Sequence, residues 1–225
     1  MTVLSDVMED YLKAIYTLQR ERGPPVGTSA IAEYLGVTPP TVASMLEKLE
    51  ERGLVHREKY KGVELTEEGE AVALEVLRHH RLLESYLAEH LDYEWSEVHD
   101  EADALEHHIS EEFERRVAER LGHPAVDPHG DPIPSAELEP LAVDDTETLA
   151  DHEVGDRLVI SRVNDQNEEE LRYLSEVGIR PGMTVEVLEV TPIGLLTVRV
   201  DGHEQHLPES IARTIRVRPA ALEAE

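Results

Sequence analysis

The sequence predicts a mainly α-helical chain that ends in a small β domain. Apolar residues recur at helical spacing through most of residues 8–121. Residues 122–140 are dense in proline and glycine, and beyond residue 148 apolar and polar residues alternate as they do in strands. A chain of 225 residues is long enough for two to three domains. We therefore expect domains at residues 1–66, 67–140 and 148–220.

Three helices are predicted within the first 66 residues. Helical spacing over residues 8–20 ends at Gly23-Pro24-Pro25, which cannot continue a helix. A second helix over residues 28–35 begins with a threonine and a serine that can cap it, and a third over residues 38–52 has prolines in its first turn. Gly36 supplies the turn between them, which is the spacing of a helix-turn-helix.

A β-hairpin is predicted directly after the third helix. Residues 54–57 and 62–65 have the composition of two short strands, and the basic, aromatic segment 59–61 lies between them. Three short helices followed by a hairpin predict a winged helix-turn-helix, which is a DNA-binding fold. The alternative for such a unit is a module that binds only other proteins.

The start of the third helix carries short side chains that can approach base edges in the major groove. A lysine further along this helix and the basic tip of the hairpin suit phosphate groups. The residues predicted to contact double-stranded DNA are Thr38, Pro39, Pro40, Thr41, Ser44, Lys48, Arg57, Lys59 and Lys61.

Two long helices are predicted next, over residues 66–91 and 96–121. An extended connection follows because proline interrupts helices. The last domain is predicted to be a small β-barrel with one short helix near residues 168–177. Its expected strands are residues 157–160, 184–190, 196–200 and 214–217.

The charge of the chain is unevenly distributed. A formal net charge of −28 argues against DNA binding, since basic residues normally provide much of its free energy. Residues 1–66, however, carry eight Lys or Arg against ten Asp or Glu, and the rest of the chain carries thirteen against thirty-nine. Arginine also outnumbers lysine by 17 to 4, and with the excess of carboxylates this predicts a halophilic protein, in which salt screens the repulsion. An acidic protein from an ordinary environment is the alternative.

The sequence contains no apolar run close to eighteen residues and turns acidic directly after its first residues. We therefore expect a soluble, cytoplasmic protein without a membrane partner. The chain has no cysteine, which excludes both disulfides and thiolate metal sites. Any metal ligands must be nitrogen and oxygen atoms.

Histidines and carboxylates gather at helical spacing in two of the predicted helices. Four of them share one face if residues 96–121 form one helix, and an antiparallel pair of helices could bring two further ligands next to them. The candidate ligands are His99, Asp103, Glu106 and His107 on the later helix, His80 and Glu84 on the earlier one, and Asp10 on the first helix.

Imidazole combined with carboxylates suits Mn(II) or Fe(II). The alternative is a solvated acidic helix face on which the histidines are incidental. The other histidines are predicted to be surface residues or neighbours of ligands, and they are His79, His90, His108, His123, His129, His152, His203 and His206.

Six segments spread over the whole chain match one known family. They are residues 8–16 (MEDYLKAIY), 39–42 (PPTV), 80–84 (HRLLE), 98–107 (VHDEADALEH), 132–134 (PIP) and 174–182 (LSEVGIRPG). In these segments the chain resembles the diphtheria-toxin-repressor family of metal-dependent transcriptional regulators. The resemblance implies a homodimer with three domains: a winged helix-turn-helix, a helical dimerisation and metal-binding domain, and a C-terminal FeoA-type small β-barrel.

The resemblance also implies which residues bind metal. The primary, activating site would consist of Asp10, Asp103, Glu106 and His107, and an ancillary site of His80, Glu84 and His99. The FeoA-type domain would add a ligand near Asn167 or Glu170.

The chain departs from the family pattern at three positions. The iron-sensing branch has methionine and cysteine where this chain has Asp10 and Asp103, so the site resembles that of the manganese branch. Lys13 stands where short manganese regulators have a further carboxylate, which argues against a close pair of metal ions. The departures favour Mn(II) over Fe(II).

These patterns together predict a metal-dependent repressor of metal-uptake genes, and not an enzyme. The alternatives are an Fe(II)-selective repressor, a winged-helix regulator that senses an organic ligand, and a carboxylate-histidine metalloenzyme. The enzyme is disfavoured because the sequence has neither a His-Glu-x-x-His motif nor paired Glu-x-x-His motifs.

Overall fold

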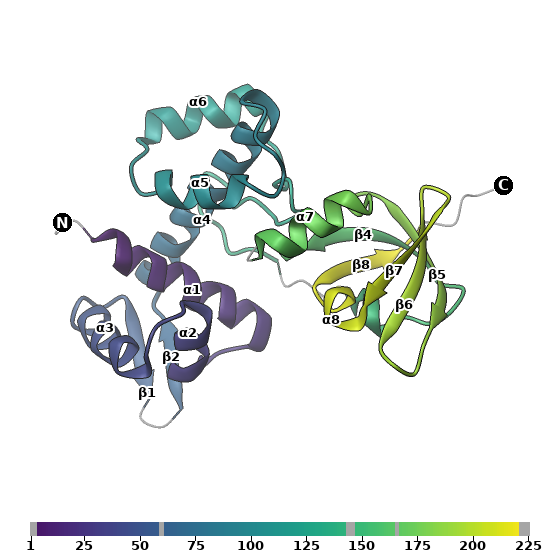
Figure 1. Ribbon diagram of the computed structural model, residues 1–225. Coiled ribbons are helices and arrows are strands. Elements are labelled where there is room, and N and C mark those ends of the chain that lie inside the picture. The colour runs from purple at the N-terminus through teal and green to yellow at the C-terminus, as the bar shows by residue number, and fades with distance from the viewer. Residues whose placement is uncertain (1–3, 59–60, 143–146, 165–166, 221–225) are drawn as a thin grey trace. The chain divides into compact units, whose positions relative to one another are not determined.

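The computed structural model describes residues 4–58, 61–142, 147–164 and 167–220 (Figure 1). The chain divides into two compact units, and the helical segment 67–140 contributes to both. The first unit consists of Met1–His80, Ala104–Glu114 and Ile133–Asp144, and the second of Arg81–Asp103, Arg115–Pro132 and Asp145–Glu225.

The first unit contains the predicted helix-turn-helix and its hairpin. The three helices are α1 (Asp6–Arg22), α2 (Thr28–Tyr34) and α3 (Pro39–Glu51), and two prolines occupy the first turn of α3, where their missing N–H groups cost nothing. Strands β1 (Val55–Glu58) and β2 (Gly62–Leu65) pair antiparallel. Their apolar faces meet in one core that includes Leu12, Ile15, Ile31, Val42, Leu46, Leu49 and Val63.

The hairpin is anchored to the segment that follows α1. Val26 and Val63 exchange two backbone hydrogen bonds of 2.9 Å each. Gly62 has a φ of +143°, and a Cβ at this position would lie 2.3 Å from the carbonyl oxygen of Val26. Only glycine permits this close approach, so the sequence places the hairpin against the helices.

Helix α4 (Glu67–His90) begins where the hairpin ends. The Thr66 hydroxyl accepts a hydrogen bond from the backbone N–H of Gly69 (3.1 Å), which satisfies one of the donors at the start of the helix. Ala73, Leu74 and Leu77 extend the core of the first unit. The helix continues past His80 into the second unit.

The predicted helix over residues 96–121 is wrong, because the structure has two helices there. Helix α5 (Val98–Leu105) ends before Glu106, and helix α6 (Glu111–Leu121) begins after Ser110. The Ser110 hydroxyl accepts a hydrogen bond from the Phe113 N–H (3.3 Å), a contact typical of a helix start. Glu106 and His107 therefore lie in a turn, and the expectation that one continuous helix aligns them with His99 and Asp103 fails.

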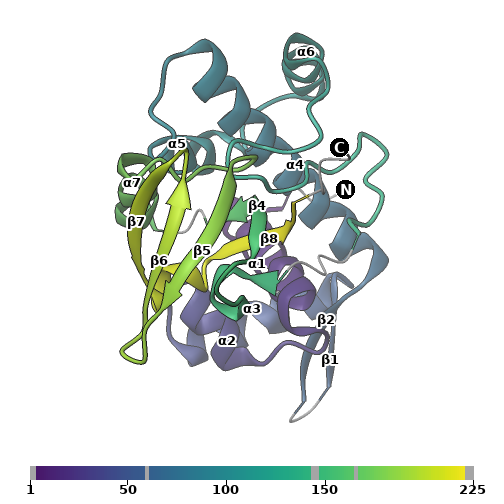
Figure 2. The same ribbon diagram turned by 90° about the vertical axis from the view of Figure 1, so that its right-hand side faces the viewer.

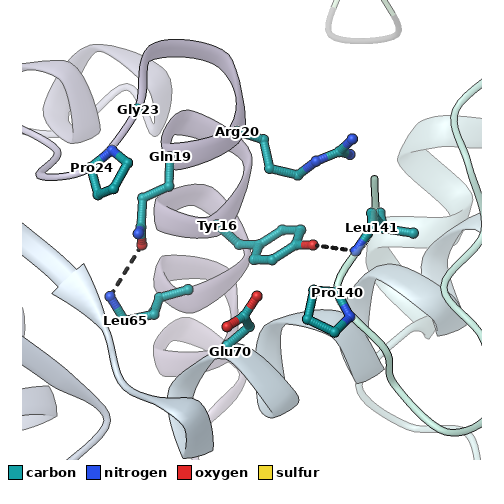
Figure 3. Close-up of a pocket in the computed structure, with 9 residues that line it drawn as sticks. All are labelled: Tyr16, Gln19, Arg20, Gly23, Pro24, Leu65, Glu70, Pro140 and Leu141. Atoms are coloured by element: carbon teal, nitrogen blue, oxygen red, sulfur yellow. Dashed lines mark hydrogen bonds between the residues drawn. The ribbon is translucent and has the colours of Figure 1, made fainter. Parts of the chain in front are cut away.

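Residues 140–142 pack against α1. The backbone N–H of Leu141 donates to the Tyr16 hydroxyl (3.1 Å), and Arg20 donates to the carbonyl of Ala142. Between this segment and α1 lies a hollow of about 460 Å³, into which the Tyr16 ring projects (Figure 3).

The second unit ends in a six-stranded antiparallel sheet of order β3-β8-β4-β5-β6-β7. Figure 2 shows β5, β6 and β7 side by side in this sheet. Strand β7 was not predicted, and neither was the two-residue strand β3. The strands are β3 (Glu147–Thr148), β4 (Arg157–Val163), β5 (Thr184–Val190), β6 (Leu195–Val200), β7 (His203–Pro208) and β8 (Ile215–Pro219).

Short helices accompany the sheet, and its core is apolar. The helices are η1 (Leu149–Asp151), α7 (Glu168–Glu176) and α8 (Glu209–Ala212). The core includes Leu158, Ile160, Leu171, Leu174, Val185, Val187, Val198 and Val217. The predicted fold class, mainly helical with a small C-terminal β domain, is confirmed. Among the described residues, every helix is too short or too polar to cross a membrane.

Candidate functional site

Asp10, Glu106 and His107 come together in the first unit, and we call them the α1 cluster. One potential ligand atom from each residue lies within 4.8 Å of the others. His107 Nε2 is 2.9 Å from Asp10 Oδ1 and 3.4 Å from Glu106 Oε1. Asp10 comes from α1 and the other two from the turn after α5, so the cluster joins segments almost one hundred residues apart.

The carboxylate of Glu106 is buried between two basic side chains. Its Oε2 lies 2.6 Å from His80 Nδ1, and its Oε1 accepts a hydrogen bond from the Lys13 ammonium at 2.6 Å. Lys13 thus places a permanent positive charge on a carboxylate of the α1 cluster.

Glu9 orients the imidazole of His107, a contact that sequence reasoning missed. Glu9 Oε2 lies 2.7 Å from His107 Nδ1, which leaves Nε2 directed at Asp10. A carboxylate on the far nitrogen of a histidine ligand is a common arrangement around protein-bound metals. Asp10 was selected by residue type and by family resemblance, and neither of these pointed to Glu9.

The titration of the α1 cluster reflects its partial burial. Burial raises the pKa of Asp10, against the lowering effect of His107 and Lys13. Burial disfavours the charged form of His107, but its hydrogen bond to Glu9 and the charges of Glu106 and Asp10 raise its pKa overall. A divalent cation would stabilise the ionised carboxylates that repel each other here, so the donor set fits such an ion.

His79 was predicted to be a surface residue or a neighbour of a ligand, and the structure places it in the interior. Its Nδ1 lies 3.1 Å from the backbone carbonyl of Glu106, and its Nε2 lies 3.5 Å from Glu114. Arg78 also contacts Glu114 and donates to the carbonyl of Pro134 (2.6 Å). These contacts support the turn that carries the α1 cluster.

Three of the remaining predicted ligands, Glu84, His99 and Asp103, lie in the second unit. His99 Nδ1 is 3.3 Å from Glu84 Oε1, and its Nε2 is 3.7 Å from Asp103 of the same helix. Because Asp103 belongs to the second unit, its predicted role in the primary site stays a prediction. The same holds for the ancillary site, whose residue His80 belongs to the first unit.

A second group of potential ligands in the second unit is fully enclosed. Glu84, Asp127 and His129, which we call the loop cluster, are all buried, and a ligand atom from each lies within 4.8 Å of the others. His129 was predicted to be a surface residue or a neighbour of a ligand; it is buried and its Nδ1 lies 3.7 Å from the predicted ligand Glu84. Asp127 and His129 belong to the proline- and glycine-rich connection, which helical periodicity does not address; their spacing of two residues was the available signal.

Backbone hydrogen bonds hold the loop cluster in place. Asp127 Oδ1 accepts from the N–H groups of His129 (2.8 Å) and Asp131 (2.9 Å). The Trp95 indole donates to the carbonyl of Pro128 (2.8 Å), and His129 Nε2 lies 3.0 Å from the carbonyl of Trp95. The side chains of this cluster are therefore oriented by the fold itself.

Burial raises the pKa of Asp127 well above its ordinary value, and the charges of Glu84 and Asp131 raise it further. Arg81 Nε lies 3.6 Å from Asp127 and opposes this effect only in part. Two buried carboxylates and an imidazole form a site that a divalent cation would stabilise.

Asn167 and Glu170 lie at the start of α7. The Asn167 side chain accepts from the N–H groups of Glu169 and Glu170 and donates to Glu170 Oε1 (3.1 Å). Asn167 therefore acts as a helix cap, and a role of either residue as a metal ligand stays a prediction.

The residues predicted to read DNA are exposed at the start of α3. Thr38, Pro39, Pro40, Thr41, Ser44 and Lys48 all face solvent. Thr38 and Thr41 share a hydrogen bond between their hydroxyl groups (2.8 Å). On the hairpin, Arg57 and Lys61 reach carboxylates of their own chain, and the bond to Glu58 raises the pKa of Lys61. Lys59 lies outside the described residues.

Comparisons with known proteins define the class of this protein as a metal-dependent, DNA-binding transcriptional repressor. Residues 3–63 match the model of the iron dependent repressor N-terminal DNA binding domain, and residues 66–135 match that of the metal binding and dimerisation domain. Residues 147–219 match the FeoA domain. The chain belongs to the iron-dependent repressor family, which includes the diphtheria toxin repressors.

Relatives match along nearly their whole length. The iron-dependent repressor IdeR of Mycobacterium tuberculosis is 36% identical over 231 residues, covering 96% of this chain and 99% of that protein. The diphtheria toxin repressor of Corynebacterium efficiens is 34% identical over 228 residues, covering 96% of this chain and 97% of that protein. Both relatives are named as repressors.

Solved structures give the same result. A manganese-dependent transcriptional repressor in complex with manganese has a TM-score of 0.87 and is 36% identical, covering 95% of this chain and 100% of that chain. The repressor ScaR with bound Zn²⁺ has a TM-score of 0.79 and is 34% identical, covering 95% of this chain and 99% of that chain.

Proposed function

We propose that this chain represses metal-uptake genes when Mn(II) binds to Asp10, Glu106 and His107. The observation that carries the proposal is the contact of His107 with Asp10, because it joins the first helix of the DNA-binding fold to the turn after α5. Asp103 is proposed as a further ligand. Mn(II) is favoured over Fe(II) because the donors are carboxylates and imidazole, with neither sulfur ligand of the iron-sensing branch.

The bound ion supplies positive charge that offsets the repulsion between Asp10 and Glu106. The chain's own residues pass this effect to the DNA-reading helix. Leu12 and Ile15 of α1 pack in the same core as Val42 and Leu46 of α3, so a fixed α1 fixes the orientation of α3. Linkage then requires that the ion favours the DNA-competent state and that DNA tightens binding of the ion.

The chain acts as a dimer in this proposal, since residues 66–135 match a dimerisation domain. Two copies of α3 would enter successive major grooves of a palindromic operator. His80, Glu84 and His99 are proposed to form an ancillary site, as the family resemblance implies. Glu84 could serve either the ancillary site or the loop cluster, because it contacts His99 of the former and His129 of the latter.

A gel-shift titration tests the activation by metal. The probe is the promoter of a manganese transporter, with Mn(II), anaerobic Fe(II) or a chelator. We expect Mn(II) to produce the shift and the chelator to abolish it. Equal potency of the two ions would remove the preference for Mn(II).

A pair of variants separates metal activation from its rival, a regulator that senses an organic ligand. Glu106→Ala combined with His107→Ala should abolish the Mn(II)-dependent shift. His108→Ala is the matched control, because His108 is the exposed neighbour of His107. Unchanged DNA binding by the double variant would contradict activation through this cluster.

A further inference from the structure

The surface predicted to face DNA contains carboxylates that contact its own basic residues. Arg57, on the first strand of the hairpin, lies between two glutamates of α3. Its Nη1 is 3.8 Å from Glu47 Oε1 and 3.6 Å from Glu50 Oε2. Both glutamates are exposed, so neither is held there by burial.

The second described basic residue of the hairpin is paired in the same way. Lys61 Nζ lies 2.6 Å from Glu58 Oε2, and both side chains are exposed. Arg57, Lys61, Glu47, Glu50 and Glu58 together carry two positive and three negative formal charges. A surface that should attract a polyanion is therefore slightly acidic in this region.

This arrangement changes the usual energetics of binding to phosphate. A free arginine or lysine that neutralises a phosphate releases a condensed counterion, so affinity falls as salt rises, with a slope of about −0.9 per contact in a plot of log affinity against log salt concentration. A basic residue that already has a tethered carboxylate must exchange that partner for the phosphate. The displaced carboxylate then lies close to the DNA and repels it unless dissolved cations screen it.

We propose that Glu47, Glu50 and Glu58 are tethered counter-ions of the DNA-reading surface. They compete with phosphates for Arg57 and Lys61, weaken DNA binding at low salt, and reduce the dependence of affinity on salt. The inference rests on the proposed function, because it assumes that the hairpin approaches DNA. It assigns to the exposed acidic residues of α3 a role in setting the salt range over which the repressor binds.

The test compares the full-length protein with its Glu47→Gln, Glu50→Gln double variant. Fluorescence anisotropy would measure binding to a promoter duplex and to a random duplex of equal length, with Mn(II), from about 0.1 to about 1 M KCl. The double variant frees Arg57 of each subunit from Glu47 and Glu50. The slope of log affinity against log salt concentration should therefore steepen by about 1.8 per dimer. The affinity advantage of the double variant should therefore shrink by about 60-fold over this range.

Three further variants show whether the effect passes through Arg57. Arg57→Gln should cancel the steeper slope when added to the double variant, and should change the wild-type slope far less. Glu153→Gln combined with Glu169→Gln removes the same charge from exposed positions of the C-terminal domain and should leave the slope unchanged. Equal melting temperatures would show that the variants are folded.

The outcomes separate this inference from the proposed function. Binding of the promoter duplex with the same slope in wild type and double variant would overturn the inference and leave the repressor function intact. An equal change in slope from the control pair would also overturn it, because net charge alone would then explain the effect. Failure of the wild-type protein to bind either duplex in the presence of Mn(II) would overturn both.

Discussion

The α1 cluster and the loop cluster contain the same ligand types in different surroundings. In the α1 cluster the Asp10 side chain is 41% exposed, and Lys13 provides a cation in direct contact. The loop cluster is enclosed, and Arg81 Nε lies 3.6 Å from Asp127 Oδ2. An open, partly neutralised site suits an ion that exchanges with solvent, whereas an enclosed one suits an ion that stays bound and stabilises the fold.

The largest expected effect comes from breaking the loop that carries the second cluster. Gly130 has a φ of +92°, and a Cβ there would lie 2.1 Å from the carbonyl oxygen of Ser161. Gly130→Ala should lower the free energy of unfolding by about 3 kcal/mol. The new Cβ is fixed to the backbone of residue 130 and would meet the backbone of Ser161, so a flexible side chain cannot relieve the clash. Mass spectrometry under native conditions should show loss of one bound ion per subunit, with the ion of the α1 cluster retained.

Gly155→Ala is the control for that substitution. Gly155 has a similar φ of +100° with nothing within 4 Å of a Cβ, so backbone strain is present without a clash. We expect a cost of about 1 kcal/mol and no loss of ion. Equal damage from both substitutions would show that the close approach to Ser161 is unimportant.

A smaller effect is expected from removing the tethered cation of the α1 cluster. Lys13→Met should raise the affinity of the α1 cluster for Mn(II) about tenfold. The Lys13 ammonium then no longer competes with the ion for the Glu106 carboxylate, and the attraction between the ion and this carboxylate is unchanged. Calorimetric titration would measure it, and the loop cluster should be unaffected. Lys13→Arg keeps the charge and should leave the affinity near that of the wild type; a tenfold gain there would rule out the electrostatic explanation.

The smallest expected effect is a pH dependence of the metal-free protein. Folding raises the pKa of His107 through its bond to Glu9 and the nearby carboxylates, which outweigh its burial. The protonated ring therefore stabilises the fold fully below the pKa of the unfolded chain, and this stabilisation disappears as pH rises through the higher, folded-state pKa. Thermal melts with chelator between about pH 6 and about pH 8 should show the decline.

His107→Gln should flatten that profile without changing the response of the loop cluster. An unchanged profile in this variant would assign the pH dependence to another group. Excess Mn(II) should also suppress the decline, because metal binding requires the neutral imidazole.

The helices and strands were largely predictable where local spacing decides them. The helix expected over residues 8–20 is observed as Asp6–Arg22, and the hairpin lies where the two strand-like segments 54–57 and 62–65 predicted it. The break at Ser110 was not foreseen, because the apolar pattern continues across it and a serine cap is visible only once the turn has formed. This one break changed the geometric basis for grouping His99 with His107.

Part of the candidate site was predictable for a similar reason. Asp10, Glu106 and His107 were selected by residue type and by family resemblance, and the structure brings them together. Glu9, Lys13 and the buried His129 were not selected as site residues. Their roles depend on contacts between residues far apart in the sequence, and helical or strand periodicity describes only residues that are close in the sequence.

The sequence by itself determined the kinds of atoms available and the local elements that carry them. The absence of cysteine limits any ion to nitrogen and oxygen ligands. The spacing of apolar residues predicts the helices, because that spacing involves residues only a few positions apart. Tertiary structure alone decided which carboxylate meets which cation. Lys13 meets Glu106 across 93 positions because packed helices bring them together, and such packing depends on the whole core.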